Sequence, residues 1–395
     1  MSGNIFDDIP KKDSIILNSR QLEQEFIPKE LPHRRNQIEE IVKHISPALK
    51  GERPQNLLIY GKTGVGKTAV MSNVGEQVPK EILWVNLNCY IIKSEYSLLA
   101  TIHNQLVKDA EKVPHTGWSK EKLYDVLKEH LKEKQQPIIL VLDELDKLVL
   151  CKDNRGNDFL YKIFALNEDI KPGISIIGIT NYTRINENLE DRTKNRLNED
   201  SLTFPPYNAL QLTDILQQRA ETALKKGSFE EGVITLCAAY AAQRSGDART
   251  ALRFLRNAAR KADSENADRI IEEHVNYVKK QVEYDAIKDA VGEVQDNTHK
   301  LALLSAIAHE HETSNEKVST GQVYDTYQAI CKNSKYGLNP LSLRQITDFI
   351  TEFDERGIIS AKITYNGRYG RTRYIYSKLS VSELSEIIKE YELKL

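Results

Sequence analysis

Eight consecutive residues have the types and spacing that bind nucleotide phosphates. The pattern G-x-x-x-x-G-K-[ST] is matched by Gly61, Lys62, Thr63, Gly64, Val65, Gly66, Lys67 and Thr68. The glycines of such a loop let backbone amides face the α- and β-phosphates, and the following helix adds its positive N-terminus. Lys67 would reach the β- and γ-phosphates, and the Thr68 hydroxyl would bind magnesium. An apolar strand pattern at residues 56–60 precedes the loop, which makes an accidental glycine-rich turn the weaker explanation.

Two acidic residues follow an unbroken apolar run. Residues 137–142 have the pattern of a parallel strand covered on both faces, and Asp143 and Glu144 come next. Asp143 would hold magnesium through water, and Glu144 would polarise the water that attacks the γ-phosphate. Acidic residues after a strand also cap helices, but the phosphate loop upstream favours a role in hydrolysis.

A polar residue also ends the next strand pattern, because Asn181 follows residues 174–180. Its amide could sense the γ-phosphate and orient the water beside Glu144, although asparagine is also a common turn former. Strand patterns alternate with helical stretches at residues 56–60, 82–88, 137–144, 174–181 and 201–204. This alternation predicts a doubly wound α/β sheet with the nucleotide at the carboxyl ends of the strands.

The composition limits the class of protein. A chain of 395 residues exceeds what one hydrophobic core supports and indicates two or three domains. A net charge of -2 excludes binding of nucleic acid through bulk positive charge, so any such contact needs a local patch. The four cysteines form no C-x-x-C pair and predict neither a zinc site nor a disulfide framework. With no membrane-length apolar run and no signal peptide pattern, we expect a cytoplasmic protein.

Helical patterns replace strand patterns after Tyr207. We expect helices at residues 209–225, 231–245, 247–262 and 272–283, which would form a lid over the nucleotide. A charged stretch at residues 283–288 would then lead into a third region. The expected parts are an N-terminal tail (1–20), a nucleotide-binding domain (21–206) with a helical insertion at about 90–120, a lid (207–284) and a winged helix-turn-helix domain (285–395).

The last region carries the local signals of a winged helix. Ser342 and Gln345 form a capping box for a helix that Gly357 would end. Residues 358–364 and 373–376 then have strand patterns on either side of an Asn-Gly turn at 366–367.

The expected hairpin, or wing, is basic, since residues 360–378 hold five Lys or Arg and no acid. Duplex DNA suits this surface, with the helix in the major groove and the wing along the phosphates. The expected DNA contacts are Ser342, Arg344, Gln345 and Thr347 on the helix, and Arg368, Tyr369, Gly370, Arg371 and Arg373 in the wing. The alternatives are a solubilising edge hairpin or a surface for protein contacts.

Several short strings, in their order and spacing, resemble the AAA+ ATPases, and among them the archaeal replication initiators of the origin recognition complex and cell-division-cycle-six type. The strings are Glu30-Leu31-Pro32-His33-Arg34, the two ATPase motifs, Phe204-Pro205-Pro206-Tyr207-Asn208, Gly246-Asp247-Ala248-Arg249 and Gly367-Arg368-Tyr369-Gly370. The resemblance covers nearly the whole chain and implies an AAA+ P-loop ATPase with a helical lid, followed by a winged helix.

The resemblance also implies roles for single residues around the nucleotide. The segment Leu31, Pro32, His33 and Arg34 would pack against the adenine ring, and Tyr207 would lie near the same base. Arg249 would reach from the lid to the phosphates, although it could instead belong to the solvated face of its helix.

The resemblance also implies that an arginine completing the active site of a neighbouring subunit lies in residues 191–197. Arg196 directly precedes Leu197 and so fits a pattern of the type S-R-[FL]. Arg192 instead fits an Asp-Pro-Arg pattern from which the proline is missing. Both residues remain candidates. Either matters only if subunits stack.

The helical insertion would add a further DNA contact. In the family an insertion after the second strand contacts DNA, and residues 113–118 are similar to its tip. We expect contacts near Thr116 and Gly117, while Trp118 is a DNA contact or, by base rates, a core anchor.

Together with the ATPase and wing residues, the resemblance implies an initiator that binds ATP or ADP with Mg²⁺, hydrolyses ATP slowly, binds duplex DNA at origins and recruits the replicative helicase of the MCM type. Paralogous initiator subunits are further candidate partners, and association with the nucleoid follows. Two alternatives stay open, an ATP-switched transcription regulator and a helicase or clamp loader without DNA specificity of its own. Nucleotide binding without turnover is compatible with every motif.

Overall fold

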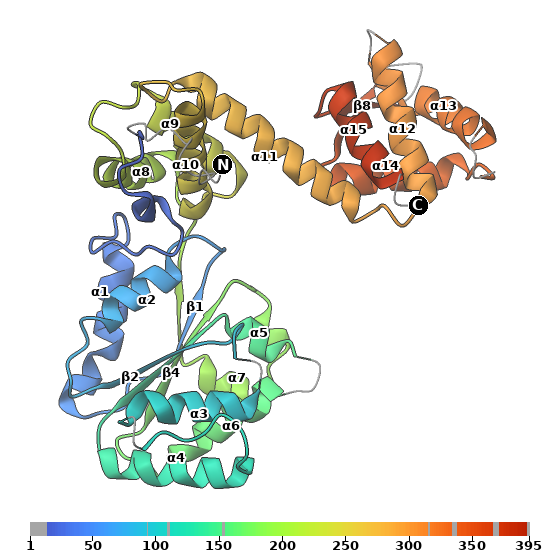
Figure 1. Cartoon of the computed structure of the whole chain (residues 1–395). Coiled ribbons are helices and arrows are strands. Elements are labelled where there is room, and N and C mark those ends of the chain that lie inside the picture. Colours follow the sequence, from blue (N-terminus) through green and yellow to red (C-terminus); the bar gives the residue numbers. More distant parts are fainter. Residues whose placement is uncertain are drawn as a thin grey trace, which may run out of the picture. The chain divides into compact units, whose positions relative to one another are not determined.

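The computed structural model describes residues 14–92, 94–108, 111–151, 155–314, 317–333, 338–365 and 371–392. Its contacts divide the chain into two compact units, Met1–Val275 and Asn276–Leu395 (Figure 1). Three expected wing contacts, Arg368, Tyr369 and Gly370, lie outside the described residues, as does the expected turn at residues 366–367.

A five-stranded parallel sheet in the order β2-β3-β4-β1-β5 forms the centre of the first unit. The strands are β1 (Leu57–Tyr60), β2 (Leu83–Asn88), β3 (Ile138–Asp143), β4 (Ile174–Thr180) and β5 (Asp200–Thr203). All five correspond to the strand patterns in the sequence, with ends that differ by at most one residue. The predicted α/β class with a parallel sheet is confirmed.

Helices cover both faces of this sheet (Figure 1). One face packs against α1 (Arg35–Ile45) and α2 (Lys67–Gly75), and the other against α3 (Glu95–Leu106), α4 (Lys120–Lys134), α5 (Leu145–Val149), α6 (Arg155–Leu166) and α7 (Asp191–Leu197). In β3, Ile138 and Leu140 enter one core while Ile139 and Val141 enter the other. Because successive side chains of a strand point to opposite faces, a strand buried on both sides is apolar throughout.

The lid consists of α8 (Ala209–Ala223), α9 (Val233–Arg244) and α10 (Ala248–Ser264), and α11 (Glu272–Gly292) follows. The charged stretch at residues 283–288, which was expected to lead into a third region, belongs to α11 and is helical. The expected boundary between residues 284 and 285 falls inside this helix, and the contacts divide the chain earlier, after Val275.

The residues that begin the described chain pack on the lid. Asp263 of α10 accepts hydrogen bonds from the Ser14 hydroxyl (2.6 Å) and the Ile15 amide (2.8 Å). Ile16 forms an isolated antiparallel β-bridge with Leu224, and the short 3₁₀ helix η1 (Ser19–Leu22) follows. Residues 14–20 are thus held to the lid, whereas the sequence suggested a tail. Sequence periodicity misses such an interaction because backbone groups and one carboxylate carry it.

The second unit has the order of a winged helix. It contains α12 (Thr298–Thr313), β6 (Val318–Ser319), α13 (Thr320–Asn333), α14 (Leu343–Glu355), β7 (Ile359–Tyr365), β8 (Arg371–Ser377) and α15 (Val381–Glu392). The predicted capping box of Ser342 and Gln345 is present at the start of α14. Gly357, with φ of 76°, ends this helix and turns the chain into β7. Among the helices of the described residues, none is long and apolar enough to cross a membrane.

Candidate nucleotide and DNA sites

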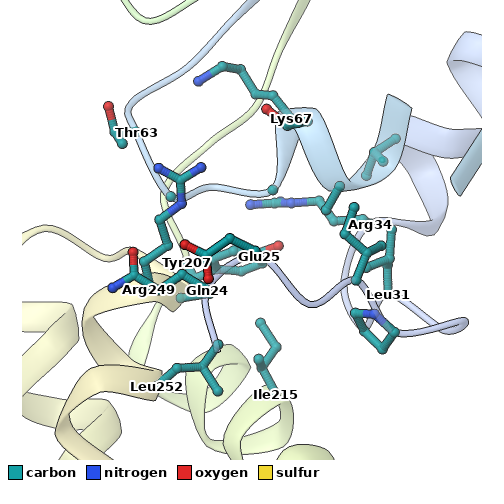
Figure 2. A pocket seen from close by; sticks show the side chains of 18 of the residues that line it. Gln24, Glu25, Leu31, Arg34, Thr63, Lys67, Tyr207, Ile215, Arg249 and Leu252 are labelled. Atoms are coloured by element: carbon teal, nitrogen blue, oxygen red, sulfur yellow. The ribbon is translucent and has the colours of Figure 1, made fainter. Parts of the chain in front are cut away.

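A cavity of about 440 Å³ lies in the first unit between the sheet edge, the phosphate loop, lid helices α8 and α10, and residues 24–28 (Figure 2). The predicted site residues that line it are Leu31, Pro32, Arg34, Thr63, Gly64, Gly66, Lys67, Thr68, Asp143, Glu144, Asn181, Tyr207 and Arg249. The fold thus brings together residues from the phosphate loop, two strand ends and the lid. Four predicted residues, His33, Gly61, Lys62 and Val65, are outside this lining.

The phosphate loop has the conformation that its glycines permit, with φ of 78° at Gly64 and 89° at Gly66. Lys67 begins α2 and is buried. Its ammonium donates hydrogen bonds to the carbonyls of Gly61 (2.6 Å) and Lys62 (2.8 Å). Burial lowers the pKa of Lys67 to about 8. The loop therefore holds a lysine that is removed from water and, among the described residues, donates hydrogen bonds to two carbonyls.

Thr68 and Asp143 are joined by a hydrogen bond of 2.8 Å from the hydroxyl to the carboxylate. This pairing matches the donor set that holds magnesium beside a bound triphosphate, because Mg²⁺ binds through one or two protein oxygens plus phosphates and water. Among the described residues, no group of three His, Cys, Asp or Glu could hold an ion. A magnesium ion held by these two oxygens would take its other ligands from nucleotide phosphates and water.

Glu144 has an unusual backbone conformation. Its φ of 54° and ψ of 43° are left-handed, and it precedes α5 as the N-cap residue. Its amide donates to the Asp143 carboxylate at 2.9 Å. A residue other than glycine in this region costs roughly 1–3 kcal/mol, and such strain concentrates at functional sites.

Asn181 connects the end of β4 to the phosphate loop. Its side-chain amide donates to the Thr63 hydroxyl at 3.1 Å. One residue earlier, the Thr180 hydroxyl donates to the buried Asp146 carboxylate at 3.0 Å. An amide at this position can contact a γ-phosphate beside Thr63.

Arg34 fixes the walls of the cavity. The side chain is 2% exposed and donates to the carbonyls of Val65 (2.9 Å) and Pro205 (2.8 Å). Its guanidinium lies 3.8 Å from the centre of the Tyr207 ring. Arg34 therefore connects the phosphate loop to the segment that leads into the lid, and its guanidinium lies over one face of the Tyr207 ring.

His33, which was expected in the segment beside the adenine ring, contacts the lid helix α8. It has φ of 60°, and its imidazole pairs with Asp214 of α8 at 2.8 Å. This interaction places it outside the cavity lining, while Leu31 and Pro32 remain as the apolar wall.

The lid touches the phosphate loop directly. The Ala248 amide at the start of α10 donates to the Gly64 carbonyl at 3.1 Å. A Cβ atom on Gly64 would lie 2.6 Å from the Asp247 Cβ, so this approach requires glycine. Figure 2 shows the Arg249 guanidinium pointing toward the loop, on the side of Thr63 and Lys67.

The two candidate arginines of α7 have different surroundings. The Arg192 guanidinium donates to Glu190 at 2.8 Å and lies 4.4 Å from the centre of the Tyr161 ring. The Arg196 side chain is exposed and has no side-chain partner within the described part of the chain. Both remain predictions for a residue that acts on a neighbouring subunit.

The expected insertion at about residues 90–120 contains α3 and leads into α4. Thr116 and Gly117 are exposed, with φ of 101° at Gly117. Trp118 is half-buried against the core and has the Lys122 ammonium 4.1 Å from its ring centre. At the base, buried Glu95 accepts hydrogen bonds from Lys120 (3.0 Å) and Lys162.

In the second unit, the wing and helix α14 are bonded to each other. Arg373 of β8 donates to the Thr351 hydroxyl (2.9 Å) and the Thr347 carbonyl (3.4 Å) of α14. Arg371 is exposed and lies 4.9 Å from the centre of the Tyr365 ring. On α14, Arg344 is exposed, while Ser342 and Gln345 bond to each other in the capping box.

Family models match three parts of the chain. They are an AAA ATPase domain at residues 30–177, a Cdc6 AAA+ ATPase-type lid domain at residues 213–280 and a CDC6 C-terminal winged helix domain at residues 295–387. An ORC1-type DNA replication protein of Pyrococcus abyssi is 38% identical over 98% of this chain and 92% of its own length. One from Methanosarcina mazei is 38% identical over 99% of this chain and 94% of its own.

The chain belongs to the family of ORC1-type DNA replication proteins. A solved structure of Aeropyrum pernix ORC1 in complex with DNA matches with a TM-score of 0.63 and 34% identity, over 96% of this chain and 98% of that one. The predicted family and the predicted AAA+ and winged-helix fold are therefore confirmed. The family also assigns an ATPase domain that binds nucleotide to the first unit.

Sequence reasoning missed several residues of this ORC1-type cavity. Residues 24–28 and the α8 side chains Gln218 and Arg219 line it without belonging to any motif. The sequence contains one indication that Arg219 is buried, because Arg219 follows Leu212 and Ile215 at the helical spacing of the apolar face of α8. A charged residue on the buried face of a helix needs a specific partner.

Proposed function

We propose that this chain is an ATP-dependent replication initiator that binds duplex origin DNA and recruits the MCM-type replicative helicase. ATP binding and slow hydrolysis would act as the switch, and paralogous initiator subunits would be additional partners. Such a protein works in the cytoplasm, associated with the nucleoid. Family membership supports the proposal, together with the presence of one nucleotide cavity and one winged helix in the same chain.

The observation that carries the switch is the contact between lid and phosphate loop, from the Ala248 amide to the Gly64 carbonyl. In this proposal Lys67 and Thr68 bind the triphosphate and Mg²⁺, and Asp143 holds the metal. Magnesium would neutralise charge that develops on the phosphates. Loss of the γ-phosphate would then change contacts on both sides of this hydrogen bond.

Turnover depends on three other residues in this proposal. Glu144 would polarise the attacking water, Asn181 would orient that water, and Arg249 would report the γ-phosphate to the lid. Slow hydrolysis fits a site that is completed only by an arginine from a neighbouring subunit, through Arg192 or Arg196.

DNA binding would use two surfaces. The winged helix would place Ser342, Arg344, Gln345 and Thr347 in the major groove and Arg371 of the wing on phosphates. The insertion would add small polar and backbone contacts at Thr116 and Gly117. The winged-helix surface belongs to the second unit, and the insertion surface belongs to the first unit.

The test is to mix the full chain with sheared genomic DNA from its source, with and without ATP, and to sequence the bound fragments. We expect a few strong clusters that disappear when Arg344 and Arg371 are replaced by Ala. A Lys389→Ala variant, changed at an exposed position of α15, should retain them. Clusters spread over many promoters would instead indicate a transcription regulator. Absence of enrichment would indicate a loader directed by protein partners.

A further inference from the structure

Helix α10 of the lid carries a row of arginines on its outer face. The arginine row consists of Arg249, Arg253, Arg256 and Arg260, and the spacings of four, three and four residues place them on one side of the helix. Arg249 and Arg260 are exposed, and Arg253 and Arg256 are half-buried. The opposite side of α10 packs into the lid through Ala251, Phe254, Leu255, Ala258 and Ala262. The row therefore faces away from the lid core.

The arginine row has no acidic partner within the part of the chain that the structure describes. None of its members forms a hydrogen bond or an ion pair there. In Arg253 and Arg256 only the Nε atoms are buried without a partner, so the terminal nitrogens are open to solvent. The one acid of α10, Asp263, accepts hydrogen bonds from Ser14 and Ile15 instead. Like charges at these spacings destabilise a helix, so an anionic ligand would stabilise this one.

Helix α4 shows how a solvated charged face of this chain is built. Lysines and acids are interspersed along α4, and they form ion pairs. Lys132 pairs with Glu129 at 3.1 Å, and Lys128 pairs with Asp169 at 2.6 Å. Mixed charges of this kind are typical of a solubilising surface. A row of one sign in a chain with a net charge of -2 is instead typical of a surface that binds phosphates.

The first arginine of the row has a different position from the other three. Arg249 lines the nucleotide cavity, and Figure 2 shows it pointing toward the phosphate loop, whereas the others are outside the lining. From Arg253 to Arg260 an α-helix rises about 10 Å. One strand of duplex DNA presents a phosphate about every 3.4 Å of its axis, or about three phosphates over this length. The three arginines thus match the charge density of one DNA strand.

We propose that Arg253, Arg256 and Arg260 bind backbone phosphates of duplex DNA. This inference rests on the proposed function of the chain as a DNA-binding initiator, and it adds a surface on the lid to those of the winged helix and the insertion. Guanidinium groups bind phosphate oxygens through paired, charge-assisted hydrogen bonds. Because phosphate contacts carry no base information, the row adds affinity for every DNA sequence.

The same helix would then connect the nucleotide to the DNA. At its first turn, the Ala248 amide donates to the Gly64 carbonyl of the phosphate loop at 3.1 Å, and Arg249 lines the cavity. The later turns carry the proposed DNA contacts. A lid that moves with the state of the nucleotide would move these contacts as well. ATP and DNA should therefore change each other's affinity by the same factor.

The experiment uses the full chain with all three arginines replaced, Arg253→Gln, Arg256→Gln and Arg260→Gln, because glutamine keeps a polar side chain and a similar helix propensity. The ligand is a duplex of random sequence, titrated at several salt concentrations with ATP and Mg²⁺. The matched control removes three exposed lysines elsewhere in the first unit, which are Lys43, Lys50 and Lys80, each replaced by Gln. Both variants lose the same charge.

We expect the slope of log K against log salt to fall by up to about 3 in the arginine variant, about 1 for each lost phosphate contact, and to stay near the parental value in the lysine control. The single variant Arg260→Gln should lower it by about 1. ATP affinity without DNA should be the same in all variants, which shows that the cavity is intact. Equal slopes for the arginine variant and the lysine control would overturn the proposal.

A second measurement tests the connection between the two ligands. Saturating duplex should change the dissociation constant of ATP about fivefold or more in the unsubstituted chain, and less in the arginine variant. The same change in both proteins would overturn the connection through α10. If the unsubstituted chain binds no duplex at all, the proposed function itself fails, and the DNA role of the row fails with it.

Discussion

Lys67 has a buried ammonium whose only hydrogen-bond acceptors in the described structure are two carbonyls of its own loop. Removal from water disfavours the charged form, and the nearby Arg249 charge acts in the same direction, against the attraction of Asp143. The result is a pKa of about 8. Bound phosphates would stabilise the charged form and raise this pKa again.

ATP affinity should therefore depend on pH above 8. A lysine is charged below its pKa, so affinity should change little between about pH 7 and 8 and fall by up to about tenfold per pH unit above pH 8. The triphosphate does not titrate in this range, because its last pKa is about 6 to 7. Calorimetry at pH 8.5 in two buffers of different ionisation enthalpy should show proton uptake on binding. Identical heats in both buffers would contradict this prediction.

At the scale of secondary-structure elements, the wing carries two arginines with different tasks. Arg371 is exposed at the end of β8, whereas Arg373 bonds to Thr347 and Thr351 of α14. One arginine is thus available to phosphate, and the other fixes the wing on the helix that would enter the groove.

Replacing each arginine by Ala should separate these tasks. Arg371→Ala should weaken binding to all DNA sequences and reduce the slope of log K against log salt by about 1. Arg373→Ala should change the slope of log K against log salt less than Arg371→Ala does. The Arg373→Ala variant should instead lose its preference for specific DNA sites. Thr351→Val, which removes the hydroxyl partner of Arg373, should reproduce that loss. Equal slopes for the parent and Arg371→Ala, in DNA titrations at several salt concentrations, would exclude a phosphate contact at Arg371.

The base of the insertion depends on one buried carboxylate. Burial alone would raise the pKa of Glu95, but hydrogen bonds from Lys162 and Lys120 hold it below its ordinary value. The stabilising contribution of this cluster is therefore present at neutral pH and is lost as the pH falls through the lowered pKa.

Glu95→Gln should destabilise the first unit by roughly 2 kcal/mol, because two ammonium groups lose a buried partner. In differential scanning calorimetry at pH 7 this corresponds to a decrease of roughly 5 °C in the midpoint. Glu129→Gln is the control, since Glu129 pairs with Lys132 at the surface. The difference between the two variants should shrink in acid. An equal midpoint for both at pH 7 would contradict a structural role of the cluster.

At the scale of the whole molecule, a complete nucleotide site needs residues from the sheet, the lid and residues 24–28. An arginine from a second copy would add to this set. Arg196 is the better candidate on geometry, because Arg192 already contacts Glu190 and Tyr161.

Mixing two inactive variants tests this arrangement. Lys67→Ala should not bind ATP but keeps its α7 arginines, whereas Arg196→Ala binds ATP and lacks the arginine. We expect each alone to be inactive and the mixture to regain part of the ATPase rate in the presence of DNA. If Arg196→Ala alone turns over at the parental rate while Arg192→Ala does not, the acting residue is Arg192.

The sequence by itself determined the parts of this protein that depend on local pattern. The phosphate loop, the strand that ends in Asp143, and the capping box of Ser342 and Gln345 each depend on neighbouring residues, and each was located from spacing. Because buried parallel strands are continuous apolar runs, the strands of the sheet could also be predicted from the sequence. Order and spacing of the motifs then indicated the family.

Only the tertiary structure decided which side chains meet across long stretches of chain. Arg34 bonds to Pro205, 171 residues away, and Arg219 bonds to Gln21, 198 residues away. Arg373 belongs to the wing that the sequence predicts on DNA, and the fold bonds it to Thr351 of α14. The residues next to an arginine in the sequence do not show whether its side chain is buried or exposed. Only the packing of the folded chain removes water from one arginine and leaves it around another, so these pairings could not be predicted from a local pattern.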